Sequence, residues 1–360
     1  MKQNLNSDSY NKPIYKLLKD PISLISIIVI GIFLFLSIGA YFVSPDSTPY
    51  ANEQHLEIAV KKPGFSVKFL CFKNLNQRKN NFFQRLIYGQ PSEYISTPIY
   101  RDWKQGDKHF VETYTGDNPN NGEVICINPD SDYKIETRTY YLGTDRYGRC
   151  LLSQLIVGTR VSIAVGLISL FISLFIGITL GAISGYFGGW IDNVIMWLIN
   201  VVWSIPTVLL VVAITFALGK GFWQVFIAIG LTMWVDIARM VRGQVKSIKE
   251  KEYITAAKAL GFSNARIITK QILPNIIGPI TVISASNFAS AILQEAGLSF
   301  LGLGVQPPMP SWGSIIKENY GYIILDAAYM AIAPGIAIML LVLCFFALGS
   351  GIRKVIDVRN

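Results

Sequence analysis

The sequence predicts an all-α integral membrane protein with six transmembrane helices and a small periplasmic α+β insert after the first helix. Hydrophobic residues make up 51% of the 360 residues and charged residues only 15%, against about 25% charged in soluble domains. The charged residues gather before the first apolar run, between about 46 and 149, and between Arg239 and Lys270. The long apolar runs between these regions exclude an ordinary soluble fold.

Six stretches meet the length of ~20 mostly apolar residues that a helix needs to cross a bilayer core. They are Ile22–Val43, Val161–Tyr186, Val194–Leu218, Phe222–Ile237, Ile276–Leu298 and Ala327–Ser350. The fourth is the shortest and has Asp236 at one end. The first exceeds the apolar region of about 7–15 residues in a cleaved signal peptide, so we expect it to remain as a helix.

Basic residues near the span ends predict the orientation, because cytoplasmic loops carry an excess of Lys and Arg. The tail before the first span holds Lys2, Lys12, Lys16 and Lys19, which makes it cytoplasmic. Alternation then places fifteen basic residues on the inside and only Lys220 and Lys317 in the two short outside loops. Both termini are therefore expected in the cytoplasm.

Small residues recur every four positions in the second span. They are Ser169, Ser173, Gly177, Gly181 and Gly185. Such a face lets helix backbones approach closely in lipid, where apolar burial between helices contributes little. Packing inside the bundle is the simpler interpretation, and a border with a partner subunit or with the transport path is the alternative.

The segment from Glu250 to Pro274 predicts a helix–turn–helix elbow between the fourth and fifth spans. An Ala-rich helix ends at Gly261, since glycine suits the left-handed residue after a helix. Ser263 can cap a second short helix, and Pro274 suits the first turn of the fifth span. This shape fits either a docking surface or an ordinary connector.

The elbow resembles the EAA loop of binding-protein-dependent ABC importer permeases. Thr255-Ala256-Ala257 is followed by Leu260-Gly261 and then by Gln271-Ile272-Leu273-Pro274. Thr255 replaces the family's usual Glu, and Gln271 its usual Ile; Glu252, three residues earlier, lies on about the same helix face and can supply the carboxylate. The resemblance implies that this loop seats in a groove of a separate ATPase subunit.

Further motifs narrow the resemblance to the C-type permease of the dipeptide/oligopeptide (and nickel) branch. The matching positions are Gly143, Thr144, Asp145, Gly148, Arg149, Ser153, Gly158, Arg160, Ser162, Gly185–Asn193, Ser204–Thr207, Glu295, Gly297, Pro307, Pro308, Trp312, Gly313 and Gly349–Asn360. Cys150 stands where the branch usually has Asp. The resemblance is loose over residues 12–45 and nearly continuous over residues 141–360.

This resemblance implies a type I ABC importer permease fold and a bacterial inner-membrane location. The expected organisation is a cytoplasmic tail (1–21), a first transmembrane helix (22–43), a periplasmic insert (44–140), a motif segment (141–160), an ABC transmembrane type-1 domain (159–350, coupling loop 238–275) and a cytoplasmic tail (351–360). The implied partners are a second, non-identical permease, one or two ATP-binding subunits and a periplasmic substrate-binding protein, within a lipid membrane.

Several chemistries are not expected. The chain has no phosphate-binding loop with its Gly-rich cradle, so we expect no catalytic residue, no cofactor and ATP hydrolysis by partner subunits. His55 and His109 lack ligand-like spacing, which argues against a metal site. The basic residues form no stripe with stacking aromatics, which argues against nucleic acid. A Cys71–Cys126 disulfide remains an open possibility in an oxidising periplasm.

The insert should combine strands at Phe65–Phe72, His109–Tyr114 and Tyr133–Tyr141 with a helix at Asn80–Tyr88 and a hairpin turn within Trp103–Lys108. Its role is open between a lid that contacts the binding protein and an inert insertion. Asp236, Glu295 and Asp326 lie near predicted span ends, where a solvated interfacial position is favoured over a proton relay.

The resemblance implies import of di- or oligopeptides, with nickel chelates or glutathione as alternative substrates. Two further classes are kept open from the residues alone. An ion-driven secondary transporter would need ionisable residues at mid-membrane and usually an internal repeat. A non-transporting membrane scaffold would have no need of the coupling elbow.

Overall fold

The computed structural model describes residues 13–74, 79–106, 108–116, 121–127, 132–219 and 221–357. Residues 1–12 and 358–360, which belong to the two expected tails, lie outside these ranges. Lys220, expected in a short outside loop, also lies outside them. Two compact units divide the chain. The helical unit comprises Met1–Phe33, Ser162–Gly304 and Ile338–Asn360, and the second unit comprises Leu34–Val161 and Val305–Ala337.

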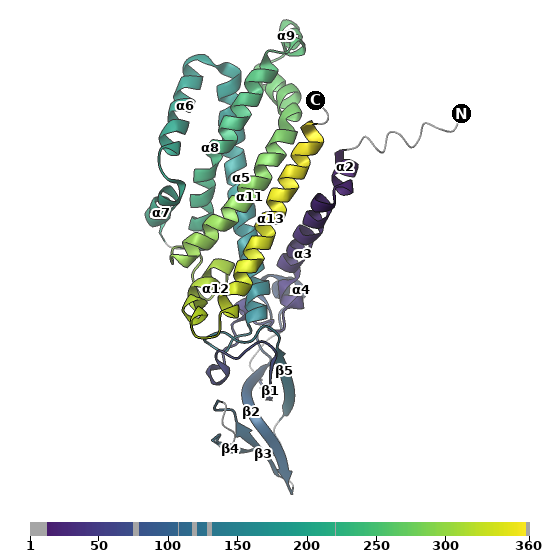
Figure 1. Ribbon diagram of the computed structural model, residues 1–360, viewed down its shortest axis with the longest axis vertical. Coiled ribbons are helices and arrows are strands. Elements are labelled where there is room, and N and C mark those ends of the chain that lie inside the picture. Colours follow the sequence, from purple (N-terminus) through teal and green to yellow (C-terminus); the bar gives the residue numbers. More distant parts are fainter. Residues whose placement is uncertain are drawn as a thin grey trace, which may run out of the picture. The chain divides into compact units, whose positions relative to one another are not determined.

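Long apolar helices dominate the described residues (Figure 1), and five of these helices are long and apolar enough to cross a membrane. They are α3 (Pro21–Val43), α5 (Leu151–Phe187), α8 (Phe222–Lys249), the run Asn264–Phe300 that ends in α11 (Ile277–Phe300), and α13 (Tyr329–Asp357). The short helix α2 (Pro13–Lys19) precedes α3. The chain therefore has the mostly helical architecture that its hydropathy predicts.

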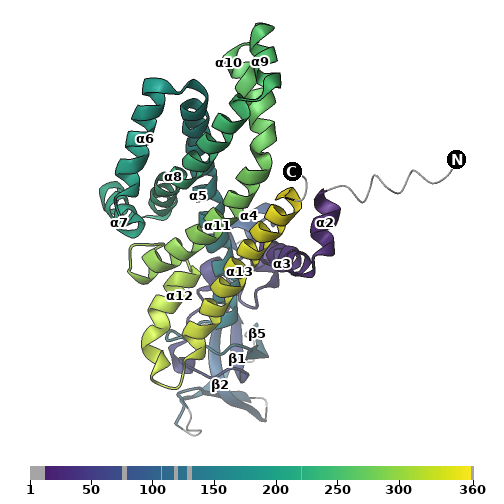
Figure 2. The ribbon, with the colours of Figure 1, turned by 45° about the horizontal axis from the view of Figure 1, so that its top comes forward.

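The third expected span, Val194–Leu218, is not one continuous helix. It is broken into α6 (Gly189–Trp203) and α7 (Thr207–Leu218), whose axes differ by 92°. Figure 2 shows the break between α6 and α7. Pro206 immediately precedes α7, and proline has no N–H to donate and clashes with the carbonyl four residues earlier. The described residues thus contain five apolar helices, or up to six spans if this bent pair counts as one.

The fourth expected span is also longer than its apolar run. The helix α8 continues past Ile237 to Lys249 and includes Arg239 and Arg242. Its buried side recurs with helical spacing up to Ile248, so packing extends the helix where hydropathy alone ends it. As a result, Asp236 lies at the middle of α8 and not near the end of the helix.

Within the described part of the insert, five strands form one antiparallel sheet in the order β4-β3-β2-β1-β5. The strands are β1 (Phe65–Lys73), β2 (Tyr94–Gln105), β3 (Lys108–Thr113), β4 (Val124–Ile127) and β5 (Tyr133–Tyr140). Three of them coincide with the expected segments, and α4 (Phe82–Tyr88) coincides with the expected helix. The strands β2 and β4 were not expected.

Both faces of strand β1, which lies between β2 and β5, are covered. Val67, Phe69 and Cys71 belong to one buried cluster, and Leu70 belongs to another with Ile99 of β2. Successive side chains in a strand point to opposite faces, so this alternation gives the sheet two apolar sides. The expected turn follows β2, since Gln105 pairs with Lys108 of β3.

The Cys71–Cys126 disulfide does not form, and both thiols are free. Cys71 lies in β1 and Cys126 in β4, with β2 and β3 between them. Neighbouring strands are about 4.8 Å apart, which separates the two residues by roughly 14 Å, whereas a disulfide needs Cα atoms within about 7 Å. Sequence spacing could not show this, because it contains no strand order.

The small-residue face of α5 lies against α8 inside the helical unit. A Cβ at Gly181 would lie 2.5 Å from the carbonyl oxygen of Ala238, and one at Gly185 would lie 2.8 Å from that of Arg242. Nearer the other end, the hydroxyl of Ser169 donates to the carbonyl of Phe226 at 3.0 Å. The face therefore permits close contact between two helices of the same chain.

Candidate functional site

The elbow consists of α9 (Glu252–Ala259) and α10 (Asn264–Ile267), followed by a π turn (Ile268–Ile272) and a 3₁₀ turn (Leu273–Ile276). Figure 1 shows α9 beyond the ends of α8 and α11 in the helical unit. The turn depends on Gly261, whose φ is 77°. The N–H of Phe262 then donates to the carbonyl of Ala257 at 3.1 Å, which closes the helix in the manner of a glycine C-terminal cap.

Buried side chains fix the elbow to the helices beneath it. Ile254 and Ala257 of α9 are buried in one cluster with Val245 and Ile248 of α8. Ile267, Ile272 and Ile276, on the return segment, belong to the same cluster. The hydroxyl of Tyr186 also donates to the side-chain oxygen of Asn264 at 2.8 Å. A displacement of the elbow would therefore be transmitted to α5, α8 and α11.

The opposite side of the elbow is exposed. Leu260 has 75% of its surface exposed and Tyr253 43%. Glu252, Thr255, Ala256, Gly261 and Pro274 are also exposed, while Leu273 is half-buried. The outer side of the elbow therefore presents two large apolar side chains, Leu260 and Tyr253, to its surroundings. Of the expected loop residues, Ala257 is the exception, because it faces the chain's own core.

An ion-pair cluster that the sequence alone does not reveal lies at the end of the helical unit that carries the elbow (Figure 1). Arg242 of α8 donates two hydrogen bonds, of 2.5 and 2.8 Å, to the carboxylate of Asp192 in α6. Lys246 donates a third at 2.7 Å. The hydroxyl of Ser184 donates to the same carboxylate. A bidentate Arg–carboxylate pair fixes orientation as well as charge, so this cluster ties α5, α6 and α8 together below the elbow.

The motif from Gly143 to Arg149 braces a loop of the second unit. The hydroxyl of Thr144 donates to the carbonyl of Ile58 at 2.6 Å and accepts from the N–H of Lys61 at 2.8 Å. A Cβ at Gly143 would lie 2.3 Å from the carbonyl oxygen of Lys61, and one at Gly148 would overlap His55. Both glycines also have positive φ, so this close approach needs glycine twice.

Asp145 and Arg149 form a buried ion pair. The Nε of Arg149 donates to Asp145 at 2.6 Å, and its other end donates to Glu318 at 2.5 Å. Burial lowers the pKa of Arg149, but the carboxylates of Asp145 and Glu318 together outweigh burial, so the pKa is raised. Glu318 lies in α12 (Trp312–Asn319), so the pair joins two distant motif segments.

The remaining motif residues are mostly structural. Trp312 is fully buried and donates its indole N–H to the carbonyl of Leu155 at 3.1 Å. Gly313 is buried beside it, and Pro307–Pro308 forms a cis peptide bond just before it. Arg160 lies over the ring of Tyr41, with its Cζ 5.0 Å from the ring centre.

Glu295 was expected in a solvated position at a span end, and this expectation is wrong. It lies inside α11 with none of its surface exposed, while Gly297 two residues later is exposed. The hydroxyl of Ser299 donates to one carboxylate oxygen at 2.7 Å and that of Ser162 to the other at 3.4 Å. Asp326, in contrast, is exposed and pairs with Lys62 at 2.7 Å.

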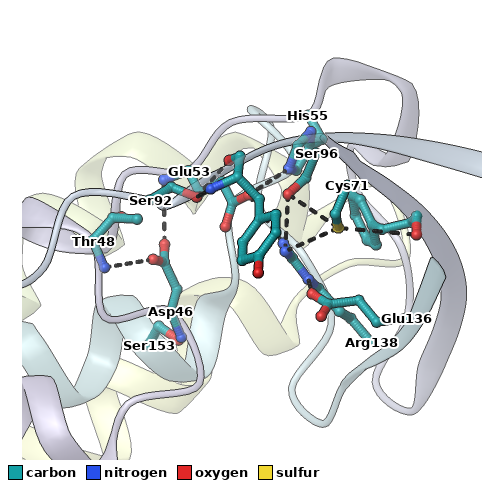
Figure 3. A network of polar contacts seen from close by, with 12 residues as sticks. Asp46, Thr48, Glu53, His55, Cys71, Ser92, Ser96, Glu136, Arg138 and Ser153 are labelled. Carbon is teal, nitrogen blue, oxygen red and sulfur yellow. Dashed lines mark hydrogen bonds and ion pairs between the residues drawn. The ribbon is translucent and has the colours of Figure 1, made fainter. Parts of the chain in front are cut away.

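A polar network joins the loop after α3 to the sheet (Figure 3). Arg138 of β5 donates to Glu53 at 3.0 Å and to Glu136 at 2.7 Å. Burial raises the pKa of Glu53, but the hydrogen bond from His55 and the contacts with Arg138 outweigh it and bring the pKa to about 2. Burial raises the pKa of Asp46, which accepts the backbone N–H of Thr48.

This network lines a cavity of about 770 Å³ in the second unit. Its walls carry both signs of charge, including Glu93 and Glu136 against Lys79 and Arg85. The guanidinium of Arg138 already has protein partners, so the network stabilises the contact between the loop and the sheet. Within the described ranges, no three His, Cys, Asp or Glu side chains come together as a set that could hold a metal ion.

Comparisons with known proteins agree with the motifs. Residues 177–357 match the family described as binding-protein-dependent transport system inner membrane component. The chain is 39% identical over 230 residues to the dipeptide transport system permease protein DppC of Alkalihalophilus pseudofirmus, covering 64% of this chain and 75% of that protein. It is 38% identical over 218 residues to the glutathione transport system permease protein GsiD of Pectobacterium atrosepticum, covering 61% and 72%.

A solved structure of the MetNI methionine ABC transporter in an inward-facing conformation aligns over 57% of this chain and 97% of its own. The TM-score is 0.47 and the sequence identity 21%. On the strength of the family match and the sequence relatives, the chain belongs to the binding-protein-dependent transport system inner membrane components, as a non-catalytic, multi-pass ABC importer permease of the dipeptide/oligopeptide branch.

Proposed function

We propose that this chain is the permease subunit of an ATP-driven importer that moves di- and oligopeptides across the bacterial inner membrane. The family match supports the importer, and the two sequence relatives support the substrate, because one is named for dipeptide and the other for glutathione transport. Glutathione is itself a short peptide. Both names therefore point to a path that admits a peptide backbone with charged ends.

The observation that carries the proposal is the two-sided elbow. Its inner side, including Ile254 and Ala257, is buried against three membrane helices, and its outer side presents Leu260 to solvent. The sequence has no phosphate-binding loop, so the energy of ATP must reach the bundle from another subunit. An exposed elbow with a fixed base is suited to receive that force and to pass it to the helices as a rigid-body movement.

The working complex would contain this chain, a second, non-identical permease, one or two ATP-binding subunits and a periplasmic substrate-binding protein. The elbow and both termini would face the cytoplasm, and the sheet of residues 65–140 the periplasm. Support for this orientation comes from Lys246, Lys249 and Lys251, which lead into the elbow, since cytoplasmic segments are enriched in basic residues. The proposed domain limits remain those given by the sequence.

A single substitution, Leu260→Asp, tests the coupling role. The side chain is exposed, so the variant should fold, whereas a charge at the buried Ala257 would damage the core as well as the docking surface. We expect peptide uptake by the reconstituted complex to fall at least tenfold, and the ATPase subunits to co-purify poorly. Leu56→Asp, at a residue 68% exposed in the second unit, is the matched control and should leave both unchanged.

The outcome also separates the alternatives. Normal ATP-dependent uptake by Leu260→Asp would overturn the coupling role. Uptake that persists without ATP would favour an ion-driven secondary transporter, and a chain that never co-purifies with an ATPase would favour a scaffold. Substrate competition distinguishes a peptide from glutathione or a nickel chelate, and the glutathione alternative is supported by the second relative.

A further inference from the structure

A cavity of about 230 Å³ lies in the helical unit beside the broken span. Five polar side chains contribute to its wall, from two long helices. They are Thr232 and Asp236 of α8, and Asn287, Ser290 and Gln294 of α11. The rest of the wall includes Trp203 and Thr207, which flank the bend between α6 and α7. The cavity is therefore polar although it is surrounded by apolar helices.

Asp236 is the unusual member of this wall. It lies at the middle of α8, between the buried residues Val235 and Ile237, yet its own side chain is exposed. In the described part of the chain, no basic side chain forms an ion pair with it. Arg239, one turn along α8, instead places its guanidinium over the ring of Trp203, 4.0 Å from the centre. A carboxylate inside a membrane helix is costly and marks a functional site by default.

Gln294 adds a second, independent observation. Its side-chain oxygen is buried, and among the described residues it has no hydrogen-bond partner. Buried acceptors normally accept a hydrogen bond, so this oxygen is available to a donor from a bound molecule. Asn287 is different, because it is 6% exposed and its amide already donates to the carbonyl of Met233 at 3.3 Å.

The unmet groups are one negative charge and one neutral acceptor. Their complement is a cation with several N–H donors, and an ammonium group has such donors and no acceptor. The interrupted helix supports this interpretation, since irregular backbone at membrane depth is tolerated where it is buried in protein or lines a water-filled cavity.

We propose that this cavity binds the charged amino terminus of a peptide during transport, with Asp236 as the counter-ion and Gln294 as a hydrogen-bond acceptor. The inference rests on the proposed peptide-import function and adds to it a recognised chemical group. It makes the permease itself, and not only the binding protein, selective for a free amine.

The test uses the complete reconstituted complex and a photoreactive tripeptide, alanyl-(4-azidophenylalanyl)-alanine, with either a free or an acetylated amino terminus. Illumination followed by mass spectrometry identifies the labelled segments. We expect the free-amine peptide to label α8 and α11 at least tenfold more than the acetylated one. Asp236→Asn should abolish this preference, and Asp236→Glu should retain it. Asp326→Asn, which removes an exposed carboxylate from a loop of the second unit, is the matched control and should not change it.

Each outcome decides the question. Equal labelling by the two peptides in the wild type, or an unchanged preference in Asp236→Asn, overturns the inference. Peptide uptake is measured in parallel, and normal uptake in that case leaves the proposed function intact. Absence of peptide uptake by the wild-type complex overturns the proposed function instead. If Asp236→Asn does not assemble, the wild-type preference and its retention in Asp236→Glu give the answer.

Discussion

Replacing Gly181 by alanine tests whether the small face of α5 is needed for contact with α8. A methyl group there would lie 2.5 Å from the carbonyl oxygen of Ala238 and 2.9 Å from the Cβ of Val241. Carbon–oxygen contacts are normally about 3.3 Å or longer, so α8 would have to withdraw by about 0.8 Å. Overpacking of this kind costs about 1–3 kcal/mol of folding free energy.

Gly243→Ala is the matched control for this experiment. Gly243 also lies within a helix, α8, but apart from the adjacent residues and backbone of that helix no described atom lies within 4 Å of a Cβ placed there. Both substitutions gain the same helix propensity of about 0.5–1 kcal/mol, so the difference between them isolates the packing cost. We expect Gly181→Ala to be about 1–3 kcal/mol less stable than Gly243→Ala, measured by equilibrium unfolding in mixed micelles. Equal stabilities would refute the close-packing argument.

Two further predictions concern the second unit. The pKa of Glu53 is about 2 in the fold, against an ordinary 4.5. The ionised side chain therefore adds about 3 kcal/mol to the free energy of unfolding above pH 4.5, and this stabilisation is lost as the pH falls towards 2. Glu53→Gln should remove this part of the acid sensitivity, which hydrogen exchange of the sheet would measure. Cys126 should react with iodoacetamide at least tenfold faster than Cys71, since Cys126 is exposed and burial raises the pKa of the Cys71 thiol; a Cys71–Cys126 disulfide in the mass spectrum would contradict the strand order.

The apolar runs alone predicted the helices, because a membrane leaves a strong compositional record: each crossing needs a long segment almost without charge. The elbow was also predictable, since Gly261 and Ser263 encode its turn through local backbone geometry. Hydropathy failed where packing or backbone chemistry decides. It joined α6 and α7 across Pro206, and it ended α8 at Ile237 although the buried side continues to Ile248.

The motif residues illustrate the same division. Asp145 and Arg149 could be singled out from the sequence, but their contact with Glu318 could not, because 169 residues separate the partners. Asp192 was noted only as part of the motif Gly185–Asn193, and only the fold brings Arg242 and Lys246 to its carboxylate. A pattern identifies a residue type, whereas an ion pair requires two distant segments to meet.

By itself, the sequence determined that this chain spans a membrane, carries a helix–turn–helix elbow and holds the motifs of an importer permease. Only the tertiary structure decided that Glu295 is fully buried, that Cys71 and Cys126 lie three strands apart, and that Asp236 lines a polar cavity with Gln294. The physical reason is that hydropathy and turn chemistry act over a few residues, while burial and charge pairing depend on which segments pack together.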